Sequence, residues 1–577
     1  MEPHLAARSK LALLLYTLVL IATISHAESY YVSSTQGDDD NTGTTPEAAF
    51  SSLERAFSVA SEDDFVHVMA GQYNPGGSLG SVDMTLQGIW VNGGYSEDWD
   101  LPPVDEIADL PEEDPRATVI RLSPGDDIHL NGGVNHLQFL QFIVDRNRTT
   151  APIQPISNTL FLGVHNCQFF GGWRVLEVEG GLGELDVVGC RFERIGGSVF
   201  ELSGLSHCDL IRNRFDQCGG QEPSEAPLWL DEVTTANVYR NSFTNAVENS
   251  IYVTSISPDP IYIDGNRFMG SGRCAVEIAT SEQVYVLNNI ITGCRYAGIL
   301  TVFPGMNSGA TNRIINNTFV GNARGILALL DNFAGRNSSY PTYNNIFSHH
   351  DLAAIELTTG PTGQSRPELR NNLFDRNAAD YLVNSDSYLI EEVNAQPGNS
   401  QNFAGAPGFE VDFPVLSAQF ALTRASSAID TATTTLAPVD DYLNINARPR
   451  NNGYDVGAFE YQDFVGPLQI SVSPREIRVP ADAGVEHQAI NLANLGGGLL
   501  DWSASECEWA RLTVLEGLIP TSQTQSISLL YDQNLGPPRD CTITFTANGV
   551  LGSPQELKVR QEGVVGGEGE GEGEGEG

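Results

Sequence analysis

Residues 261–294, IYIDGNRFMGSGRCAVEIATSEQVYVLNNIITGC, contain two copies of a short motif, Asn266-Arg267-Phe268 and Asn289-Ile290-Ile291. Its other copies are Cys167-Gln168-Phe169, Cys190-Arg191-Phe192, Asn213-Arg214-Phe215, Asn241-Ser242-Phe243, Asn317-Thr318-Phe319, Asn345-Ile346-Phe347 and Asn372-Leu373-Phe374. Successive copies are 23 to 28 residues apart. A motif that recurs at this spacing indicates a chain built from stacked structural repeats.

The residues of each repeat favour strands over helices. Short β-branched runs of alternating polarity, such as Val276-Glu277-Ile278, are present, and no amphipathic stretch of helical length is. Glycine pairs such as Gly171-Gly172 stand where corners need positive φ. Leucine-rich repeats have a similar period, but their Leu-x-x-Leu-x-Leu frame is missing. The repeats therefore predict an all-β parallel solenoid with rungs about 4.8 Å apart, a buried phenylalanine column and a ladder of mutually satisfied asparagine amides.

Six of the eight cysteines fall in the repeats. Cys167 and Cys190 take the place of asparagine in the first two copies of the motif, and Cys218 and Cys294 follow the motif by five residues. Buried cysteine behaves as a small apolar side chain. We expect free core thiols, with a stacked Cys167–Cys190 bridge as the alternative.

The first 27 residues have the features of a secretory signal peptide. Arg8 and Lys10 precede the apolar run 11–24, and Ser25-His26-Ala27 supplies small residues for cleavage. The run is too short to span a bilayer comfortably, and no later stretch is long and apolar enough for a membrane helix. These features predict an exported protein, secreted or held at the cell surface, without a transmembrane segment.

Net charge excludes two classes of partner. The chain carries 73 acidic and 31 basic residues, a formal charge of −42. Such a field repels nucleic acid and anionic membranes. Lysine is almost absent, because only Lys558 remains once residues 1–27 are removed.

Both ends of the predicted solenoid resemble known families. Residues 30–43, with Gly37-Asp38-Asp39-Asp40, and Ala70-Gly71-Gln72-Tyr73 look like the opening of pectate-lyase-like proteins, in which a strand and a helix (here about 46–60) cap the coil. Residues 447–450, ARPR, and 455–461, DVGAFEY, are similar to the closing motif of secreted proteins termed "choice-of-anchor Q". The resemblance implies a right-handed parallel β-helix over 28–462 and export, but fold alone implies no activity.

A change of composition marks a second domain. After a linker at 463–467, residues 468–562 contain alternating strands typical of an immunoglobulin-like β-sandwich. Val472-Ser473-Pro474, Trp502, Trp509 and Val559-Arg560-Gln561 resemble the BACON family, whose modules are associated with carbohydrate enzymes and with carbohydrate or mucin binding. We expect Trp502 and Trp509 to be core residues, with a binding platform as the alternative. Cys507 and Cys541 should lie on neighbouring strands, where a disulfide can form. The glycine–glutamate tail, 563–577, is expected to be disordered.

Known catalytic sets of β-helix enzymes are missing from the sequence. Polygalacturonase-like hydrolases combine clustered aspartates with His-Gly and Arg-x-Lys motifs, but the Asp-Asp pairs here lie outside the regular repeats and no Arg-x-Lys exists. Pectate-lyase elimination needs a lysine or arginine base, usually beside calcium. Since the repeats contain no lysine, only an arginine base remains.

Two outward stripes are candidate glycan-binding sites. Aligning the second strand of each repeat gives a solvent-facing column of aromatic and acidic residues: Glu177, Glu201, Trp229, Tyr252 and Glu277. Aromatic rings with nearby acceptors suit sugar rings, although exposed strand residues of good β propensity give the same pattern. The second stripe is Arg191, Arg214 and Arg267, whose guanidinium groups suit uronate or sulfate. Surface ion pairing with Glu193 and Asp216 is the alternative.

The loop 38–43, DDDNTG, offers oxygen atoms at alternate positions, as calcium loops do. It lacks the glutamate that such a loop has twelve residues from its start, where Ala49 stands. A plain turn is the alternative to a calcium site, and no other metal or cofactor is expected.

Three functions compete at this point. The first is non-catalytic binding of a polysaccharide or glycoprotein glycan, with the sandwich as a second contact. The second is a polysaccharide lyase or glycoside hydrolase with an unfamiliar site, using Glu177 and Glu201 or an arginine of the stripe. The third is a structural surface or adhesion protein. Of these three functions, the sequence favours the non-catalytic ones over the enzyme.

Overall fold

The computed structural model describes residues 27–563. Its gaps are 75–82, 97–98, 100–109, 111, 113, 125, 149, 158, 255–258, 280–282, 304–311, 331–339, 360–366, 410, 412, 415–416, 443–446, 450–451, 462–466, 482–487, 506, 508, 520–522, 532–533 and 535. The predicted signal peptide up to residue 26, most of the predicted linker and the tail after residue 563 lie outside the described residues. In the part that is described, no helix is long and apolar enough to cross a membrane.

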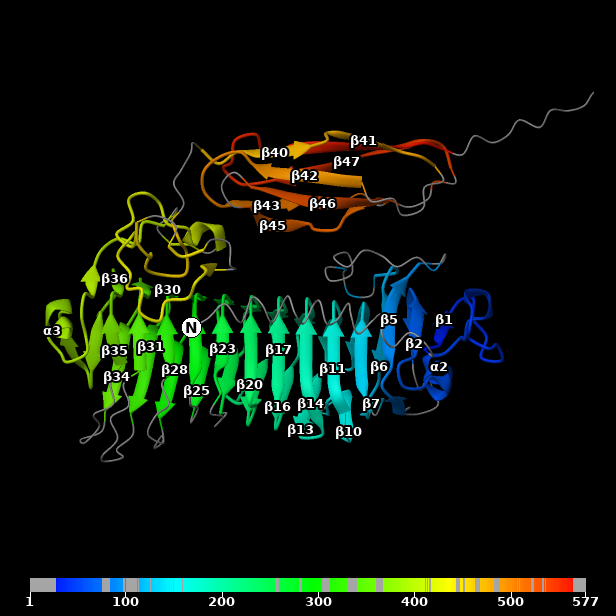
Figure 1. Cartoon of the computed structure of the whole chain (residues 1–577), viewed down its shortest axis with the longest axis horizontal. Coiled ribbons are helices and arrows are strands. Elements are labelled where there is room, and N and C mark those ends of the chain that lie inside the picture. Colours follow the sequence, from blue (N-terminus) through cyan, green and yellow to red (C-terminus); the bar gives the residue numbers. More distant parts are fainter. Residues whose placement is uncertain are drawn as a thin grey trace, which may run out of the picture.

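The repeats form the predicted parallel β-solenoid, in which three sheets run the length of the molecule (Figure 1). Sheet A is β1 (Ser29–Val32), β2 (Phe65–Met69), β5 (Trp90–Tyr95), β8 (Val134–Gln138), β11 (Thr159–His165), β14 (Leu182–Val188), β17 (His207–Ile211), β20 (Thr235–Tyr239), β23 (Ile261–Asp264), β26 (Val284–Leu287), β29 (Arg313–Ile315), β32 (Tyr340–Tyr343) and β35 (Pro367–Arg370).

Sheet B follows sheet A in every rung. Its strands are β3 (Gly71–Tyr73), β6 (Thr118–Leu122), β9 (Leu140–Val144), β12 (Gln168–Gly171), β15 (Arg191–Glu193), β18 (Arg214–Asp216), β21 (Ser242–Thr244), β24 (Arg267–Met269), β27 (Ile290–Thr292), β30 (Thr318–Val320), β33 (Ile346–Ser348), β36 (Leu373–Asp375) and β39 (Phe403–Ala404).

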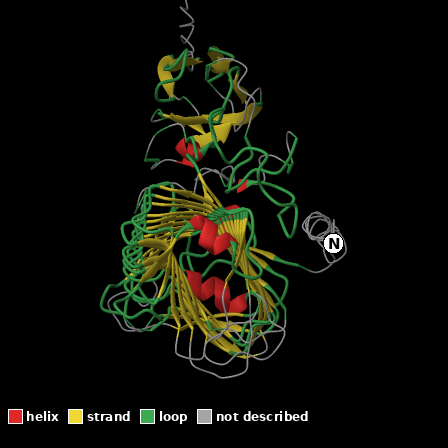
Figure 2. Ribbon diagram, turned by 90° about the vertical axis from the view of Figure 1, so that its left-hand side faces the viewer, coloured by secondary structure: helices red, strands yellow, loops and turns green. Residues whose placement is uncertain are grey.

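Sheet C closes each rung. Its strands are β4 (Asp83–Leu86), β7 (Asp127–Asn131), β10 (Ile153–Ser157), β13 (Leu176–Glu179), β16 (Phe200–Ser203), β19 (Leu228–Asp231), β22 (Ile251–Val253), β25 (Cys274–Ala279), β28 (Ala297–Phe303), β31 (Arg324–Leu330), β34 (Ala353–Thr359), β37 (Tyr381–Val383) and the antiparallel β38 (Asp386–Tyr388). Seen nearly end-on in Figure 2, the three sheets enclose one elongated core.

The phenylalanine column fills this core as predicted. Phe142, Phe169, Phe192, Phe215, Phe243 and Phe268 stack on successive rungs, with ring centroids 4.6 to 5.2 Å apart. A second run continues through Phe319, Phe347 and Phe374. Ring centroids 4.6 to 5.2 Å apart match the rung spacing expected of a parallel sheet.

The asparagine ladder occupies the tight turn between sheets A and B. From Asn213 to Asn402, each side-chain oxygen accepts from the backbone nitrogen of the preceding ladder asparagine, at 2.8 to 3.2 Å. Cys167 and Cys190 head the same column, and the Cys190 nitrogen donates to Asn213 at 2.9 Å. All six solenoid cysteines are buried free thiols, so the bridge alternative is wrong.

Residues 405–461 return along the outside of the solenoid. Asn288, Asn316, Asn344 and Asn371 precede ladder asparagines, have positive φ and donate side-chain hydrogen bonds to this closing segment. Arg448, in the ARPR motif, is buried, pairs with Glu460 at 2.7 Å and donates to the carbonyl of Gly457 at 2.8 Å. The two motifs at the end of the solenoid therefore anchor the closing segment to its last rungs.

Short helices cap the N-terminal end. In place of one helix near 46–60, the structure has a 3-10 turn η1 (Pro46–Ala48) and α2 (Leu53–Val59), whose N-cap is Ser52. The remaining helices are α3 (Ile390–Asn394) and the 3-10 turn η2 (Ser417–Phe420). Leu53 and Ala56 of α2 are buried against the first rungs.

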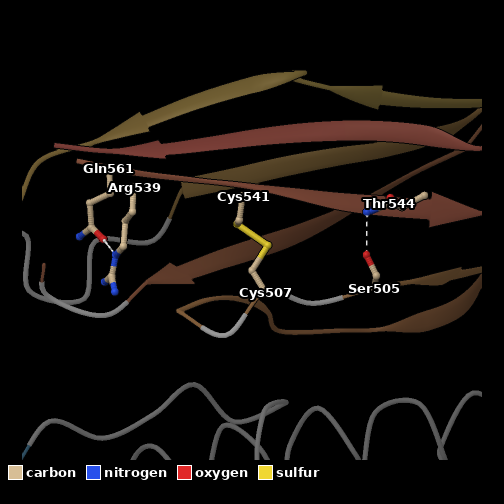
Figure 3. The surroundings of a disulfide bond; sticks show 6 residues. All are labelled: Ser505, Cys507, Arg539, Cys541, Thr544 and Gln561. Carbon is tan, nitrogen blue, oxygen red and sulfur yellow. Dashed lines mark hydrogen bonds between the residues drawn. A yellow bond between two sulfur atoms is a disulfide. The ribbon is translucent and has the colours of Figure 1, made fainter. Parts of the chain in front are cut away.

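Residues 468–562 form a two-sheet β-sandwich with its own core. One sheet is β40 (Ile470–Ser473), β42 (Gln488–Asn494), β46 (Thr524–Tyr531) and β44 (Ala510–Leu512). The other is β41 (Glu476–Val479), β48 (Gln555–Gln561), β47 (Arg539–Thr546), β43 (Leu500–Ala504) and β45 (Glu516–Ile519). Trp502 is buried in this core, Trp509 packs partly buried against it under Arg539, and Cys507 is disulfide-bonded to Cys541 (Figure 3).

The sandwich lies alongside the solenoid, over the strands of sheet B (Figure 1). Leu499 and Leu518 of the sandwich join a buried cluster with Ile290 and Val320 of sheet B and Phe459 of the closing segment. Nearer the middle of the solenoid, Arg214 pairs with Glu516 at 3.0 Å. Sheet B is thus the face that carries the second domain.

Candidate functional site

The predicted acidic and aromatic column is contiguous on the outer face of sheet C. Glu177, Glu201, Trp229, Tyr252 and Glu277 pair one after another in register, from β13 to β25. They share a face because each stands one residue after an inward-facing apolar residue, and strand side chains alternate between the two faces. The solenoid therefore places these five side chains in one row parallel to its axis.

Trp229 and Tyr252 form the centre of this row. Their ring centroids are 6.1 Å apart and the ring planes are inclined at 58°. Both side chains are half-buried, so part of each remains accessible. The Trp229 indole nitrogen donates to the Thr254 hydroxyl at 3.1 Å, and that hydroxyl donates to Asp231 at 2.7 Å. These two hydrogen bonds fix the orientation of the indole.

Two carboxylates lie beside Trp229 at one end of the row. Arg174 pairs with Glu177 at 2.7 Å and with Glu201 at 2.8 Å. Burial raises the pKa of Glu201, an effect that the Arg174 charge partly offsets. The bridging guanidinium holds both carboxylates in place, where their remaining lone pairs can accept from hydroxyl groups.

Glu277 corrects the prediction of a fully solvent-facing column. Its residue is 6% exposed, and its carboxylate takes a hydrogen bond from Asn249 at 2.8 Å and pairs with Arg273. Burial raises the pKa of Glu277, and Arg273 and Asn249 offset part of that rise. Glu277 belongs to the supporting structure next to Tyr252, because Arg273 and Asn249 from the corners before β25 and β22 enclose it.

The row becomes apolar and buried beyond Glu277. Its next members, Leu300 and Leu327, are 0% and 2% exposed and pack with Cys274 and Ala297. The accessible part of the column is therefore short. It runs from Glu177 to Tyr252.

The arginine stripe lies under the second domain. Arg191, Arg214 and Arg267 share one outward row of sheet B, and Arg191 pairs with Glu193 at 2.7 Å, as the ion-pair alternative predicts. Arg214 pairs with Glu516 of the sandwich at 3.0 Å. Arg267 lies close enough to Asp501 of the sandwich for its charge to lower that carboxyl's pKa, although burial raises the pKa more. The stripe is thus a place of interdomain contact.

The N-terminal aspartate loop is organised by internal hydrogen bonds. Asp39 accepts from the backbone nitrogens of Ser51 and Ser52, both at 2.9 Å, and from the Ser52 hydroxyl at 2.8 Å. Burial opposes ionisation of Asp39, but these bonds outweigh it and lower the pKa. Asp38 accepts from the Asp40 nitrogen at 3.0 Å. No group of three metal-ligating side chains occurs among the described residues, and Asp39 acts as a support for the N-terminus of α2.

Sequence reasoning did not find the groups that fix the row. Arg174, Asn249, Thr254 and Arg273 come from the corners of the rungs, whose lengths vary and so cannot be aligned by the repeat. A second signal was also missed, an outward row of aromatic and histidine residues on sheet A. Alternation in Phe65-Val66-His67 was visible in the sequence, but these rungs precede the first Asn/Cys-x-Phe motif.

Comparisons with known proteins agree with the solenoid fold. A family model described as the right handed beta helix region matches residues 157–307 and 231–395, so the solenoid is a right-handed parallel β-helix. Pectate lyase Pel9A is 15% identical over 77% of this chain and 98% of its own, with a TM-score of 0.36. XylC in complex with xylose is 11% identical over 75% of this chain and 99% of its own, with a TM-score of 0.40. No curated protein matches the sequence.

Proposed function

We propose that this protein binds a polysaccharide along the outer face of sheet C, with Trp229 and Tyr252 as the stacking platform. The observation that supports this most is the placement of the two partly exposed rings on adjacent rungs, with centroids 6.1 Å apart. Sugar rings have apolar C–H faces that pack on aromatic rings. A glycan chain running parallel to the solenoid axis would place neighbouring sugar units over neighbouring rungs, which are about 4.8 Å apart.

The flanking carboxylates suit a ligand rich in hydroxyl groups. Glu177 and Glu201 are held by Arg174 and Asp231 by Thr254, so these acceptors are fixed before the ligand arrives. Fixed acceptors reduce the entropy lost on binding. The platform is two rungs long because Glu277 is buried, so we expect affinity to level off with oligosaccharides of a few units.

The setting that we propose is extracellular. Residues 1–27 have the pattern of an export signal, and the closing segment resembles that of the "choice-of-anchor Q" type. We further propose that the BACON-like sandwich, docked on sheet B, acts as a second glycan contact. The binding face of sheet C lies on another side of the solenoid from the sandwich, so both can be engaged together.

Affinity electrophoresis with a panel of acidic and neutral polysaccharides tests this function. Trp229→Ala and Tyr252→Ala should each weaken retardation several-fold, since ring stacking contributes about 1 kcal/mol or somewhat more. Arg191→Ala, on sheet B, is the matched control and should leave retardation unchanged. Unchanged retardation of the Trp229→Ala/Tyr252→Ala double variant would rule this face out.

A second candidate function is glycan hydrolysis at Glu177 and Glu201. These carboxyls stand on adjacent rungs, and burial raises the pKa of Glu201, as suits a general acid. Against it, one guanidinium binds both groups. Reducing-end and 235-nm elimination assays on the same panel separate binding from catalysis. If the wild type turns over a polysaccharide and Glu201→Gln abolishes that turnover, the function is hydrolysis and not binding alone.

A further inference from the structure

Sheet A carries a row of rings on its outer face over four successive strands, β2, β5, β8 and β11. Phe65, Trp90 and His136 are direct register neighbours on β2, β5 and β8, and Phe161 on β11 follows them. Ring centroids are 5.8 Å apart for Phe65 and Trp90, 3.5 Å for Trp90 and His136, and 5.2 Å for His136 and Phe161. The contacts make one continuous line of rings parallel to the solenoid axis.

Three of these rings are partly accessible. Phe65, Trp90 and Phe161 are half-buried, whereas His136 is 2% exposed and lies against Trp90. Burial lowers the pKa of His136 to about 3, so its ring is neutral at physiological pH and packs as an aromatic side chain. The buried imidazole thus separates the exposed rings and fixes their spacing.

The row ends in a polar cluster that begins on β11 and extends over the next two rungs. His165 lies 3.4 Å from Asp186, and His207 lies 3.0 Å from Asp209, which also accepts from Asn237 at 2.7 Å. The side chains of Asp186 and Asp209 are each 31% exposed. Carboxylates at this end can accept hydrogen bonds from a molecule lying on the rings.

Two acceptors beside the rings have no partner among the described residues. They are the side-chain oxygen Oδ1 of Asn92, on β5 next to Trp90, and Oδ1 of Asp186, on β14. A buried polar atom without a partner costs free energy unless a ligand or water satisfies it. Both atoms are buried, so they mark polar positions just beneath the ring row rather than acceptors on its surface.

We propose that this sheet-A face, Phe65 to Asp209, binds a neutral polysaccharide chain whose sugar rings stack on Phe65, Trp90 and Phe161. Hydroxyl groups of the chain donate to the partly exposed carboxylates of Asp186 and Asp209. None of the ten strands of sheet A from β1 to β26 contains lysine or arginine. With neither lysine nor arginine in these strands and carboxylates at its end, the face disfavours uronate and sulfate groups.

This site is separate from the column on sheet C, so either face can bind without the other. Of the six tryptophans in the chain, Trp90 belongs to the ring row on sheet A and Trp229 to the column on sheet C. Conservative Trp90→Phe and Trp229→Phe variants keep a stacking ring while removing the reporter. The two faces can therefore be told apart by intrinsic fluorescence.

The experiment uses the full mature chain with hydroxyethylcellulose as the neutral probe and polygalacturonate as the anionic one. Hydroxyethylcellulose should retard the wild type in affinity electrophoresis and change its tryptophan emission. The part of the emission change that comes from the sheet-A face should be lost in Trp90→Phe and kept in Trp229→Phe. Phe65→Ala/Phe161→Ala should weaken retardation several-fold, and Asp186→Asn, at a partly exposed position, should weaken it independently of any effect on folding.

Contrary results are equally specific. One contrary result is that Trp229→Ala/Tyr252→Ala abolishes retardation, whereas Phe65→Ala/Phe161→Ala and Asp186→Asn leave it unchanged. That result overturns the sheet-A site and leaves the sheet-C site standing. The reverse pattern supports the sheet-A site and removes the sheet-C one. Absence of any wild-type retardation by hydroxyethylcellulose, or retardation by polygalacturonate that depends on Phe65 and Phe161, also overturns the proposal.

Discussion

The side-chain oxygen of Asn289 accepts two hydrogen bonds from Asn266, one from its backbone nitrogen at 2.8 Å and one from its side-chain nitrogen at 3.1 Å. Asn289 in turn donates to the Ile263 carbonyl at 2.8 Å and to Asn317 at 2.9 Å. One buried amide therefore satisfies groups in three rungs. The ladder is a network in which each member depends on the next.

Asn289→Leu should destabilise the solenoid by about 1–3 kcal/mol, because it leaves buried donors of Asn266 and the Ile263 carbonyl without partners. Asn74→Leu, at an exposed position outside the ladder, is the control and should change stability little. Denaturant unfolding of both variants measures the difference. Equal shifts would mean that the ladder contributes no more than a surface asparagine.

Leu499→Asp should release the sandwich from the solenoid. Leu499 is 3% exposed and packs with Ile290, Val320 and Phe459, so a carboxylate there would be buried without a partner. Arg214→Ala should release it little, because Arg214 and Glu516 are largely exposed and such pairs contribute about 0–1 kcal/mol. Small-angle scattering should show a larger radius of gyration for Leu499→Asp only. A compact Leu499→Asp variant would contradict the apolar docking.

Thiol titration should find six reactive cysteines in denaturant and eight after reduction, since only Cys507 and Cys541 are paired. Cys507→Ser/Cys541→Ser should destabilise the sandwich by about 3–4 kcal/mol, because the bridge closes a long loop in the unfolded chain. The solenoid transition should stay unchanged. Eight reactive thiols without reductant would show that the bridge does not form.

The fold was predictable because its determinants recur. An Asn-x-Phe motif at regular spacing specifies an inward ring and a turn amide in every rung, and the register of Glu177, Glu201 and Trp229 followed from the same alignment. Burial of Glu277 was not predictable, because Asn249 and Arg273 reach it from corners of irregular length. The repeat therefore predicts the strand positions that all rungs share, but not the contacts made by corner residues that differ from rung to rung.

Contacts between distant parts of the chain were also hidden. Arg214 and Glu516 are separated by 302 residues, and no sequence pattern around either residue predicts that the two are in contact. The sheet-A rings were overlooked for a related reason, since Phe65 and Trp90 precede the first recognisable repeat. Long-range docking and irregular early rungs leave no periodic signal.

Asp264 should make stability depend on pH. Burial raises its pKa from 3.8 to about 7, although Asn288, Tyr239, Arg448 and Arg240 favour its charged form. Between those two pH values the folded protein holds a proton that the unfolded chain releases, so stability is greatest at low pH and is lost as pH rises toward 7. Asp264→Asn should remove up to about 1.4 kcal/mol per pH unit of this slope.

Denaturant unfolding of the wild type and Asp264→Asn at pH 5, 6, 7 and 8 measures the effect. Asp455, whose pKa burial also raises to about 7, is present in both proteins and cancels in the difference. The wild type should lose stability relative to the variant as pH rises. Parallel stability curves would show that Asp264 does not titrate in this range.

Arg273→Ala should destabilise the protein more than Arg273→Ala combined with Glu277→Gln. The guanidinium of Arg273 pairs with the Glu277 carboxylate, which is 6% exposed, and lies over the ring of Tyr296. Removing the arginine leaves a buried charge whose remaining partner is Asn249, at a cost of about 1–3 kcal/mol because Arg273 is itself only partly buried. Neutral glutamine keeps the hydrogen bond from Asn249 without needing a counter-charge.

A double-mutant cycle on these two positions, with denaturant unfolding at pH 7, gives the coupling between them. Since Tyr252 is the register neighbour of Glu277, the cycle also tells whether this pair merely supports the platform. If it does, the double variant should regain most of the stability and also the glycan retardation of the wild type. Recovered stability without recovered binding would instead place Glu277 or Arg273 in contact with the glycan.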